Sequence, residues 1–243
     1  MAILGVIGGL GPMATVYFAR LVIEMTAAST DQEHLKTVIY SAPDIPDRTD
    51  YILGKSDKSP VPGIVEAGLA LKSIGADVIA IPCVTAHCFH SQIEKAIGLR
   101  TLNALEETAK TLENEGVRCV GLSATEGTVK SGIFQKVFEA HGIRTVTPSP
   151  EGQSRVNDLI YKQIKKTLPP DPSLFFAVKK ELADKGAEAM VLGCTELSLI
   201  KRDIEVGDGV IDVSEVLARA SVLACGKPLR SRYEKLLSGR LSG

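Results

Sequence analysis

The chain has 243 residues, which is enough for one large domain or two modest ones, each with a hydrophobic core. Its 28 Lys and Arg residues balance 29 Asp and Glu residues, so it lacks the basic surface that nucleic acids and anionic membranes favour, and a small-molecule partner is predicted instead. It has no basic leader and no apolar run near the ~18 residues of a membrane span, and its five cysteines are an odd number, so we expect a cytoplasmic protein with reduced thiols.

In the first hundred residues or so, short apolar runs alternate with longer stretches of helical period. Strands are predicted at residues 3–9, 37–43 and 77–83, and helices at 13–26, 63–75 and 86–98. This alternation is typical of βαβ units that build a parallel sheet.

The same alternation begins again near Asn103. Strands are predicted at residues 117–125, 143–148 and 188–194, and helices at 105–116, 127–142, 151–168 and 174–186. A last strand at 209–212 and a helix at 213–226 could belong to either half of the protein. We therefore predict an α/β protein of two similar lobes, residues 1–103 and 104–208, with the segment 209–243 completing the first lobe.

Two stretches at predicted strand ends share one plan. GADVIAIPCVTAHC begins at Gly75 and GAEAMVLGCTELSL begins at Gly186, and each places a cysteine, Cys83 or Cys194, at the same distance from its first glycine. The carboxyl ends of parallel strands in paired lobes border one crevice, where ligands of open α/β sheets bind. The repeat therefore predicts that the two cysteines face each other across that crevice.

Two thiols placed in this way can move a proton across a carbon atom. A cysteine between a strand end and a helix lies near the positive end of the helix dipole, which lowers the pKa of a thiol. One thiolate removes a proton from a stereocentre and the opposite thiol returns one to the other face. A lone cysteine at a strand end usually only packs, but the repeat favours a shared role for Cys83 and Cys194. Cys88, Cys119 and Cys225 lie in periodic apolar stretches and are expected in the core.

Two other kinds of site are weighed against this one. Cys83, His87, Cys88 and Cys194 offer nitrogen and sulfur ligands, but no CxxC pair is present and His87 is expected to cap or orient a helix, so no metal is predicted. The glycine loop 8–11 is half of a dinucleotide fingerprint and lacks the third glycine. Its backbone around Leu10 can instead receive a substrate carboxylate.

The chain resembles the aspartate/glutamate racemase family, in its cofactor-independent aspartate racemase branch. The motifs that carry the resemblance are GGLGPMAT at 8–15, DQEH at 31–34, IPDRT at 45–49, PCVTAH at 82–87, GTVKSG at 127–132 and GCTEL at 193–197. The resemblance implies a homodimeric racemase that uses no pyridoxal phosphate and no metal. It further implies that Cys83 and Cys194 are the acid/base thiols, with aspartate or glutamate as the substrate.

The resemblance also assigns substrate contacts. Arg48 matches a residue that binds a substrate carboxylate, and Lys165 matches a second cationic contact, a pair that suits a dicarboxylic amino acid. The matching hydroxyl and backbone donors are Thr85, Thr125, Thr128 and Thr195. Taken alone, such a cation is as often a solvated surface group, and such a threonine is as often a helix cap.

The sequence departs from the family pattern at two places. Val84 stands where the family has an asparagine that contacts the substrate, and valine neither donates nor accepts a hydrogen bond. Glu126 replaces a threonine and adds a negative charge to the second-lobe loop. Both changes leave the cysteines in place. The substrate range can therefore include amino acids other than aspartate and glutamate.

Two alternatives to a racemase remain open from the sequence. One is a related isomerase or decarboxylase of small diacids on the same scaffold, and the other is a non-enzymatic protein that binds a small acid. Retention of both cysteines favours racemisation, because decarboxylation needs only one proton donor.

Overall fold

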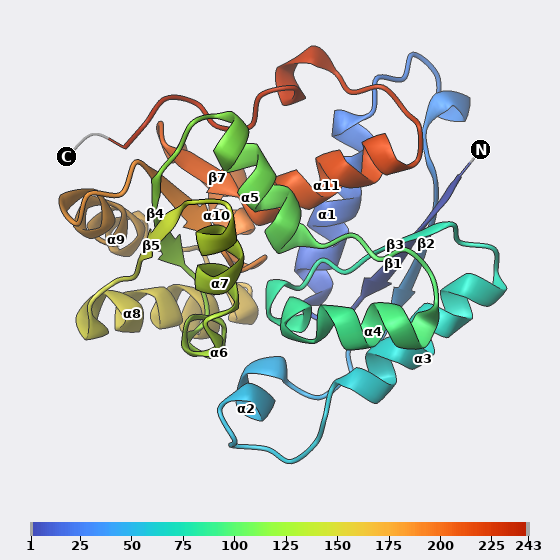
Figure 1. The fold of residues 1–243 in the computed structure, drawn as a ribbon, viewed down its shortest axis with the longest axis horizontal. Coiled ribbons are helices and arrows are strands. Elements are labelled where there is room, and N and C mark those ends of the chain that lie inside the picture. Colours follow the sequence, from blue (N-terminus) through green and yellow to red (C-terminus); the bar gives the residue numbers. More distant parts are fainter. Residues whose placement is uncertain (1, 242–243) are drawn as a thin grey trace.

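A computed structural model describes residues 2–241 and contains two parallel β-sheets flanked by helices (Figure 1). The first sheet has the strand order β2-β1-β3, and the second has the order β5-β4-β6-β7. The strands are β1 (Ile3–Gly8), β2 (Lys36–Ser41), β3 (Val78–Ala80), β4 (Cys119–Ser123), β5 (Arg144–Val146), β6 (Ala189–Leu192) and β7 (Val210–Asp212). All neighbouring strands pair in parallel, so the predicted two-lobed α/β architecture is confirmed.

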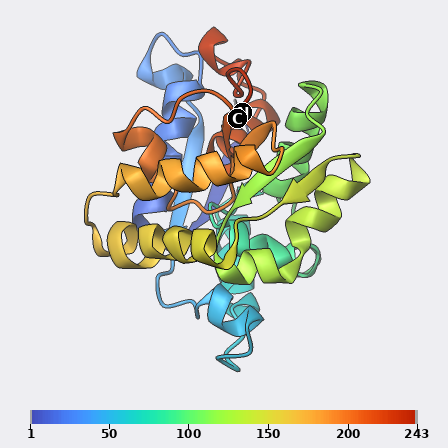
Figure 2. The same ribbon diagram turned by 90° about the vertical axis from the view of Figure 1, so that its left-hand side faces the viewer.

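Helices cover both sheets. Those of the first half are α1 (Pro12–Met25), α2 (Arg48–Ile52), α3 (Val61–Ser73) and α4 (His90–Ile97). Those of the second half are α5 (Ala104–Asn114), α6 (Glu126–Ser131), α7 (Ile133–Ala140), α8 (Pro150–Asn157), α9 (Pro172–Asp184), α10 (Ser198–Asp203) and α11 (Val213–Ala224). In the first lobe α3 packs on β1 and β2 with α4 beside it, and in the second lobe α9 packs on β4 and β6 with α8 beside it (Figure 2).

The internal repeat extends beyond the cysteines. An isolated parallel bridge joins Thr101 to Ile79 at the edge of the first sheet, in the place that β7 takes in the second. Asn103, shortly after the bridge, and Asp212, the last residue of β7, cap α5 and α11 by accepting hydrogen bonds from backbone N–H groups of the first turn. The two capped helices pack against each other, and they join the lobes.

The segment after residue 208 divides between the lobes. β7 pairs with β6 in the second sheet, although the boundary predicted at residue 209 assigns this strand to the first lobe. The helix α11 does cross back, because it packs against α1 and β3. The other lobe boundaries stay predictions.

Three predicted helices differ from the observed ones. The stretch 127–142 is two helices, because Gly132 interrupts it in the left-handed conformation with φ 67°. The stretch 151–168 leaves α-helical geometry after α8 and continues as a π-helix, Asp158–Gln163, and a 3₁₀ turn, Ile164–Lys166. The stretch 86–98 begins as a 3₁₀ helix, Val84–Phe89.

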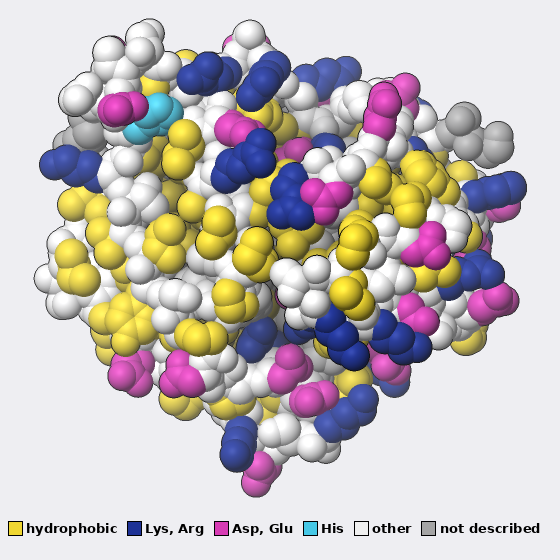
Figure 3. Space-filling model, turned by 180° about the vertical axis from the view of Figure 1, so that it is seen from behind, with side chains coloured by type: hydrophobic (Ala, Val, Ile, Leu, Met, Phe, Trp, Pro, Cys, Tyr) yellow, Lys and Arg dark blue, Asp and Glu magenta, His cyan; other side chains and the backbone are white. Residues whose placement is uncertain are grey.

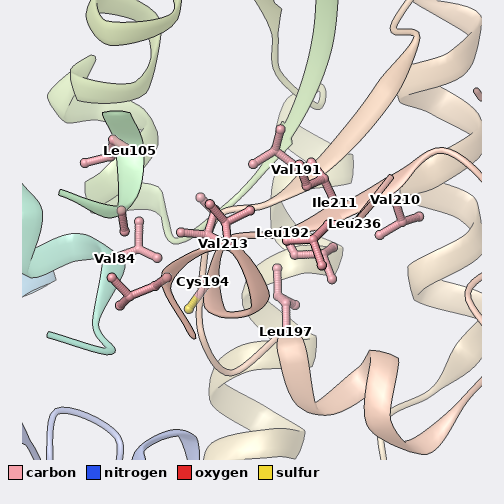
Figure 4. Close-up of a cluster of buried hydrophobic side chains, with 14 of the residues drawn as sticks. Val84, Leu105, Val191, Leu192, Cys194, Leu197, Val210, Ile211, Val213 and Leu236 are labelled. Atoms are coloured by element: carbon pink, nitrogen blue, oxygen red, sulfur yellow. The ribbon is translucent and has the colours of Figure 1, made fainter. Parts of the chain in front are cut away.

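Two clusters of buried side chains form the core. The larger one spans the second lobe and reaches into the first, and Figure 4 shows Val84, Cys194 and Leu197 among its members. The smaller one lies around α3 and α4 and includes Cys83. Packing from two different cores therefore holds the two repeated cysteines in place. Within residues 2–241 no helix has the length and apolar character to cross a bilayer.

Candidate active site

The two repeated cysteines line one small cavity of about 20 Å³, roughly the space that a single water molecule occupies. Cys83 follows β3 and precedes the 3₁₀ helix, and Cys194 follows β6 and precedes α10. Both are buried, with exposed fractions of 6% and 5%. The strand ends of the two lobes therefore meet at the same small cavity.

All the site residues predicted from the sequence, except Thr128, line this cavity. Thr128 instead lies one hydrogen bond behind it. Four further lining residues escaped the sequence interpretation, namely Asp47, Thr49, Tyr161 and Glu196. Three of them lie inside the motifs IPDRT and GCTEL, so these motifs were the sequence signal that could have identified them.

Side-chain hydroxyl groups from both lobes gather at the cavity. Thr85 Oγ1 lies 2.9 Å from Thr128 Oγ1 and 3.4 Å from Thr125 Oγ1, and the last two are 3.0 Å apart. Thr49 and Tyr161 extend the group, because Thr49 donates to Thr125 over 3.3 Å and receives the Tyr161 hydroxyl over 3.4 Å. Hydroxyl groups both donate and accept, so this cluster can adapt to a polar ligand.

Arg48 begins the short helix α2 and is nine-tenths buried. Its guanidinium donates to the carbonyls of Ile45 (3.2 Å), Pro46 (3.0 Å) and Leu10 (3.1 Å), while its Nε–H has no protein partner. Burial lowers the pKa of Arg48, but Cys83 and nearby carboxylates outweigh it and hold the pKa above its ordinary value. The site therefore keeps a fixed positive charge beside Cys83.

Leu10 contributes to the site through its backbone. Its carbonyl oxygen orients Arg48, and its side chain is buried. The glycine loop thus supports the cation that is predicted to hold a carboxylate.

Lys165 supplies the second cation, from the 3₁₀ turn after the π-helix. Its Nζ lies 3.9 Å from Glu196 Oε1, 4.0 Å from Asp47 Oδ2 and 5.0 Å from the centre of the Tyr161 ring. Burial lowers the pKa of Lys165, but Glu196 and the Cys194 sulfur outweigh it and raise the pKa above its usual value. π-Helical turns are frequent at functional sites, and this one contains Tyr161 and leads directly into the turn that holds Lys165.

Cys194 donates its thiol hydrogen to Glu196 Oε2 over 2.9 Å. Burial, followed by the Glu196 carboxylate, raises the pKa of Cys194 well above its ordinary value. The lowered pKa predicted from the helix dipole is therefore wrong for this cysteine. The two thiols differ in surroundings, with a cation beside Cys83 and a carboxylate beside Cys194.

His87 stays neutral in the interior. Burial, and then the neighbouring His90, lower the pKa of His87 to about 3, and its Nε2 lies 3.2 Å from the Ile81 carbonyl oxygen. Across residues 2–241, no three His, Cys, Asp or Glu side chains are grouped so that they could hold a metal ion. Of the remaining cysteines, Cys119 and Cys225 are buried and Cys88 is half-buried.

The two departures from the family pattern occupy different surroundings. Val84 is buried and lines the cavity, so it presents apolar surface to a ligand. Glu126 is not among the lining residues, and its carboxylate pairs with Lys130 at 2.6 Å in the first turn of α6. Only Val84 therefore changes what the cavity offers.

Comparison with known proteins agrees with the observed fold. Residues 7–221 match the sequence profile of a family described as Asp/Glu/hydantoin racemase. The chain is 29% identical over 223 residues to the broad specificity amino-acid racemase RacX of Bacillus subtilis, covering 90% of this chain and 96% of that protein. It superposes on the aspartate racemase of Picrophilus torridus with a TM-score of 0.81 at 33% identity, over 97% of this chain and 99% of that one. An aspartate racemase homologue from Pyrococcus horikoshii, at 23% identity and a TM-score of 0.75, covers 93% of this chain and has the same fold over all of its own length.

Proposed function

Because the chain belongs to the Asp/Glu/hydantoin racemase family, we propose that it interconverts the enantiomers of an amino acid by moving the α-proton between Cys83 and Cys194. It is an isomerase that works without pyridoxal phosphate. The observation that carries the proposed mechanism is that corresponding cysteines of the two lobes line one small cavity.

In this mechanism the two thiols exchange roles. For the enantiomer whose α-hydrogen faces Cys83, the Cys83 thiolate removes that proton, and the Cys194 thiol delivers its own proton to the opposite face. The C–H bond on the face toward Cys83 breaks, and a new C–H bond forms on the face toward Cys194. The product is therefore the mirror image of the substrate. The opposite enantiomer uses the same groups in reverse order.

The charge that develops on the substrate carboxylate needs stabilisation. We assign this role to Arg48, through its unpartnered Nε–H, and to the hydroxyl groups of Thr85 and Thr125. Fixed donors in a closed site stabilise such a charge more than water does, because they need no reorganisation.

The substrate must enter through a wider opening than the inner cavity. A second cavity of about 480 Å³ shares four lining residues with it, namely Asp47, Arg48, Lys165 and Glu196. We infer that an amino acid enters from this outer cavity and that the lobes part around it.

We propose aspartate and glutamate as the first substrates to test, with a broader set allowed by Val84. Arg48 and Lys165 support an acidic side chain, since one cation can take each carboxylate. The apolar Val84 removes one polar contact that would select for such a side chain. The B. subtilis relative is itself described as a racemase of broad specificity.

We further propose that the enzyme is a homodimer. β2 is the edge strand of the first sheet and most of its residues are exposed. Exposed aliphatic side chains lie on it and on α1, at Val16, Ile23 and Ile39, and Figure 3 shows hydrophobic side chains spread over much of the face behind Figure 1. A second copy of the chain would cover this surface.

The activity is tested by incubating the pure protein with L- and D-amino acids in deuterated water, followed by chiral separation and mass measurement. We expect racemisation with deuterium at Cα and no loss of rate after dialysis against a chelator. Recovery of every amino acid unchanged would contradict the proposed function, and a rate that zinc restores would contradict the two-thiol mechanism.

The two cysteines are tested one at a time. Serine is close in size but far less acidic, so Cys83→Ser and Cys194→Ser are each expected to lose racemisation by ~10³-fold. The remaining cysteine still meets the α-hydrogen of one enantiomer, so the two variants should incorporate deuterium into opposite enantiomers. If either variant racemises at nearly the parental rate, the repeated cysteine is only architectural.

A further inference from the structure

The carboxylate of Glu196 connects the buried Cys194 thiol to the outer cavity. Its Oε2 accepts the thiol hydrogen over 2.9 Å, and its Oε1 lies 3.9 Å from Lys165 Nζ. The side chain is only 9% exposed, yet it lines both the inner cavity of about 20 Å³ and the outer one of about 480 Å³.

The other residues that line both cavities are poorly suited to carry a proton to this thiol. Arg48 and Lys165 hold their protons too strongly to release them near neutral pH, because nearby anionic groups raise the pKa of each above its ordinary value. Asp47 has its carboxylate 4.0 Å from Lys165 and has no hydrogen bond to Cys194. Glu196 is therefore the acid/base group that touches the thiol and also borders the outer cavity.

The two-thiol reaction needs such a connection because each turnover reverses the proton positions. After Cys83 has taken the α-proton and Cys194 has given one up, Cys83 is a thiol and Cys194 is a thiolate. The same enantiomer cannot react again until Cys194 regains a proton and Cys83 loses one. A Cys194 thiolate would also lie directly against the Glu196 carboxylate, and the repulsion favours prompt proton uptake.

We propose that Glu196 is the proton-relay residue of Cys194 and resets this thiol between turnovers, an inference that rests on the proposed two-thiol reaction. The Glu196 carboxylate takes a proton from hydronium or a buffer acid in the outer cavity. It then passes this proton to the Cys194 thiolate, which leaves a thiol and restores the carboxylate. The reverse sequence removes the thiol proton when the opposite enantiomer is consumed.

The glycine loop before α1 leaves space for this carboxylate. A Cβ atom at Gly11 would lie 2.8 Å from Glu196 Oε1, closer than such atoms approach in folded proteins. Gly11 also has φ 137°, a conformation that side chains disfavour. The loop that resembles half of a dinucleotide fingerprint thus has a different use in this structure.

Glu196→Gln tests the relay, because glutamine has nearly the same shape and still accepts a hydrogen bond but carries no proton. We expect kcat to fall by ~10²-fold, the usual contribution of a positioned proton-transfer group. The reset takes place in the free enzyme, so kcat/KM should fall much less than kcat. The rate should also saturate at a lower substrate concentration, because the reset then limits turnover.

Glu196→Ala provides a second measurement, with acetate as the probe. Truncation opens space beside Cys194 toward the outer cavity, so acetate and acetic acid should restore kcat in proportion to their concentration. Asp47→Asn is the matched control, since it removes an equal charge near the same lysine without touching Cys194. Asparagine also retains the cap that Asp47 provides to α2, and acetate should not raise the kcat of this variant.

The outcomes separate the relay from the proposed function. A Glu196→Gln enzyme with kcat within twofold of the parent would overturn the relay. So would an equal loss of kcat and kcat/KM without acetate rescue of Glu196→Ala, or acetate stimulation of Asp47→Asn to the same degree. In each case the parent would still racemise and Cys194→Ser would still fail. If the parent racemises no amino acid, the proposed function itself fails.

Discussion

At the scale of single residues, the site sets opposite charges beside chemically identical thiols. Cys83 has the Arg48 guanidinium as its neighbour, and Cys194 has the Glu196 carboxylate. The two halves of the repeat therefore differ in electrostatics although they agree in backbone plan. Burial and Glu196 keep the proton on Cys194, whose pKa they raise.

Arg48→Ala is expected to weaken the binding of aspartate or glutamate by ~2–5 kcal/mol, because it removes one partner of a charge-assisted contact in a closed site. Titration calorimetry measures the affinity, and Arg48→Lys serves as a control that keeps the charge but not the planar fork. The melting temperature is followed in parallel, since three backbone carbonyls lose their donor. Affinity within twofold of the parent would show that Arg48 does not contact the substrate.

Val84→Asn is expected to shift the preference among amino acids without abolishing turnover. The asparagine side chain would add a donor and an acceptor to the cavity wall, where valine presents only methyl groups. The ratio of kcat/KM for aspartate to that for a neutral amino acid measures the shift, with Val84→Leu as an apolar control. An unchanged ratio would mean that this position makes no specific contact with the substrate.

At the scale of elements, the junction of β7 and α11 places a buried carboxylate between the lobes. Asp212 has no exposed surface, and its Oδ1 accepts from the Ser198 hydroxyl and the Ser214 N–H. Burial, and then Glu215, raise the pKa of Asp212 to about 7, while Lys201 partly opposes them. The junction therefore titrates near neutral pH.

The sign of the resulting pH dependence follows from linkage. The folded chain binds the Asp212 proton more strongly than the unfolded chain, whose carboxyl has a pKa of about 4. The stability that this group contributes is fully present below about pH 4 and is lost as the pH rises through about 7.

Asp212→Asn should therefore flatten the pH dependence and stabilise the protein more at pH 8 than at pH 5, relative to the parent. Asparagine is an equally good N-cap, so α11 should be retained. Urea unfolding at the two pH values gives the free energies. Asp171→Asn, at the exposed cap of α9, is the control and should not change with pH in this window. If the free energy of unfolding of Asp212→Asn changes with pH as much as that of the parent, Asp212 is not the group that titrates.

At the scale of the whole molecule, the proposed dimer surface lies on β2 and α1. Ile23→Lys should convert a dimer to a monomer, because a charged group inside an apolar interface loses its hydration without a partner. Light scattering after size-exclusion chromatography measures the mass. Leu69→Lys, on α3, is the matched control and should stay dimeric. A monomeric parent, or a dimeric Ile23→Lys variant, would contradict the proposed surface.

The sequence by itself determined the architecture and the two cysteines. Alternating apolar runs and helical periods predicted the parallel sheets and most helices, because this pattern reports which local stretches must be buried. The repeat at Cys83 and Cys194 predicted that equivalent strand ends meet, since parallel strands end at the same edge of a sheet. The architecture and the pairing of the cysteines depend on the local hydrophobic pattern and on how parallel strands are connected, and both can be recognised in the sequence.

Only the tertiary structure decided which groups surround each thiol. Tyr161 reaches the cavity because a π-helical turn interrupts a helix that the periodicity predicted to continue. Glu196 belonged to a recognised motif, but its hydrogen bond to Cys194 arises from the fold of the loop before α10. Neither the burial of Cys194 nor the charge beside it is visible in the sequence. A thiol pKa depends on both, so its direction was settled by packing across the lobes and not by position along the chain.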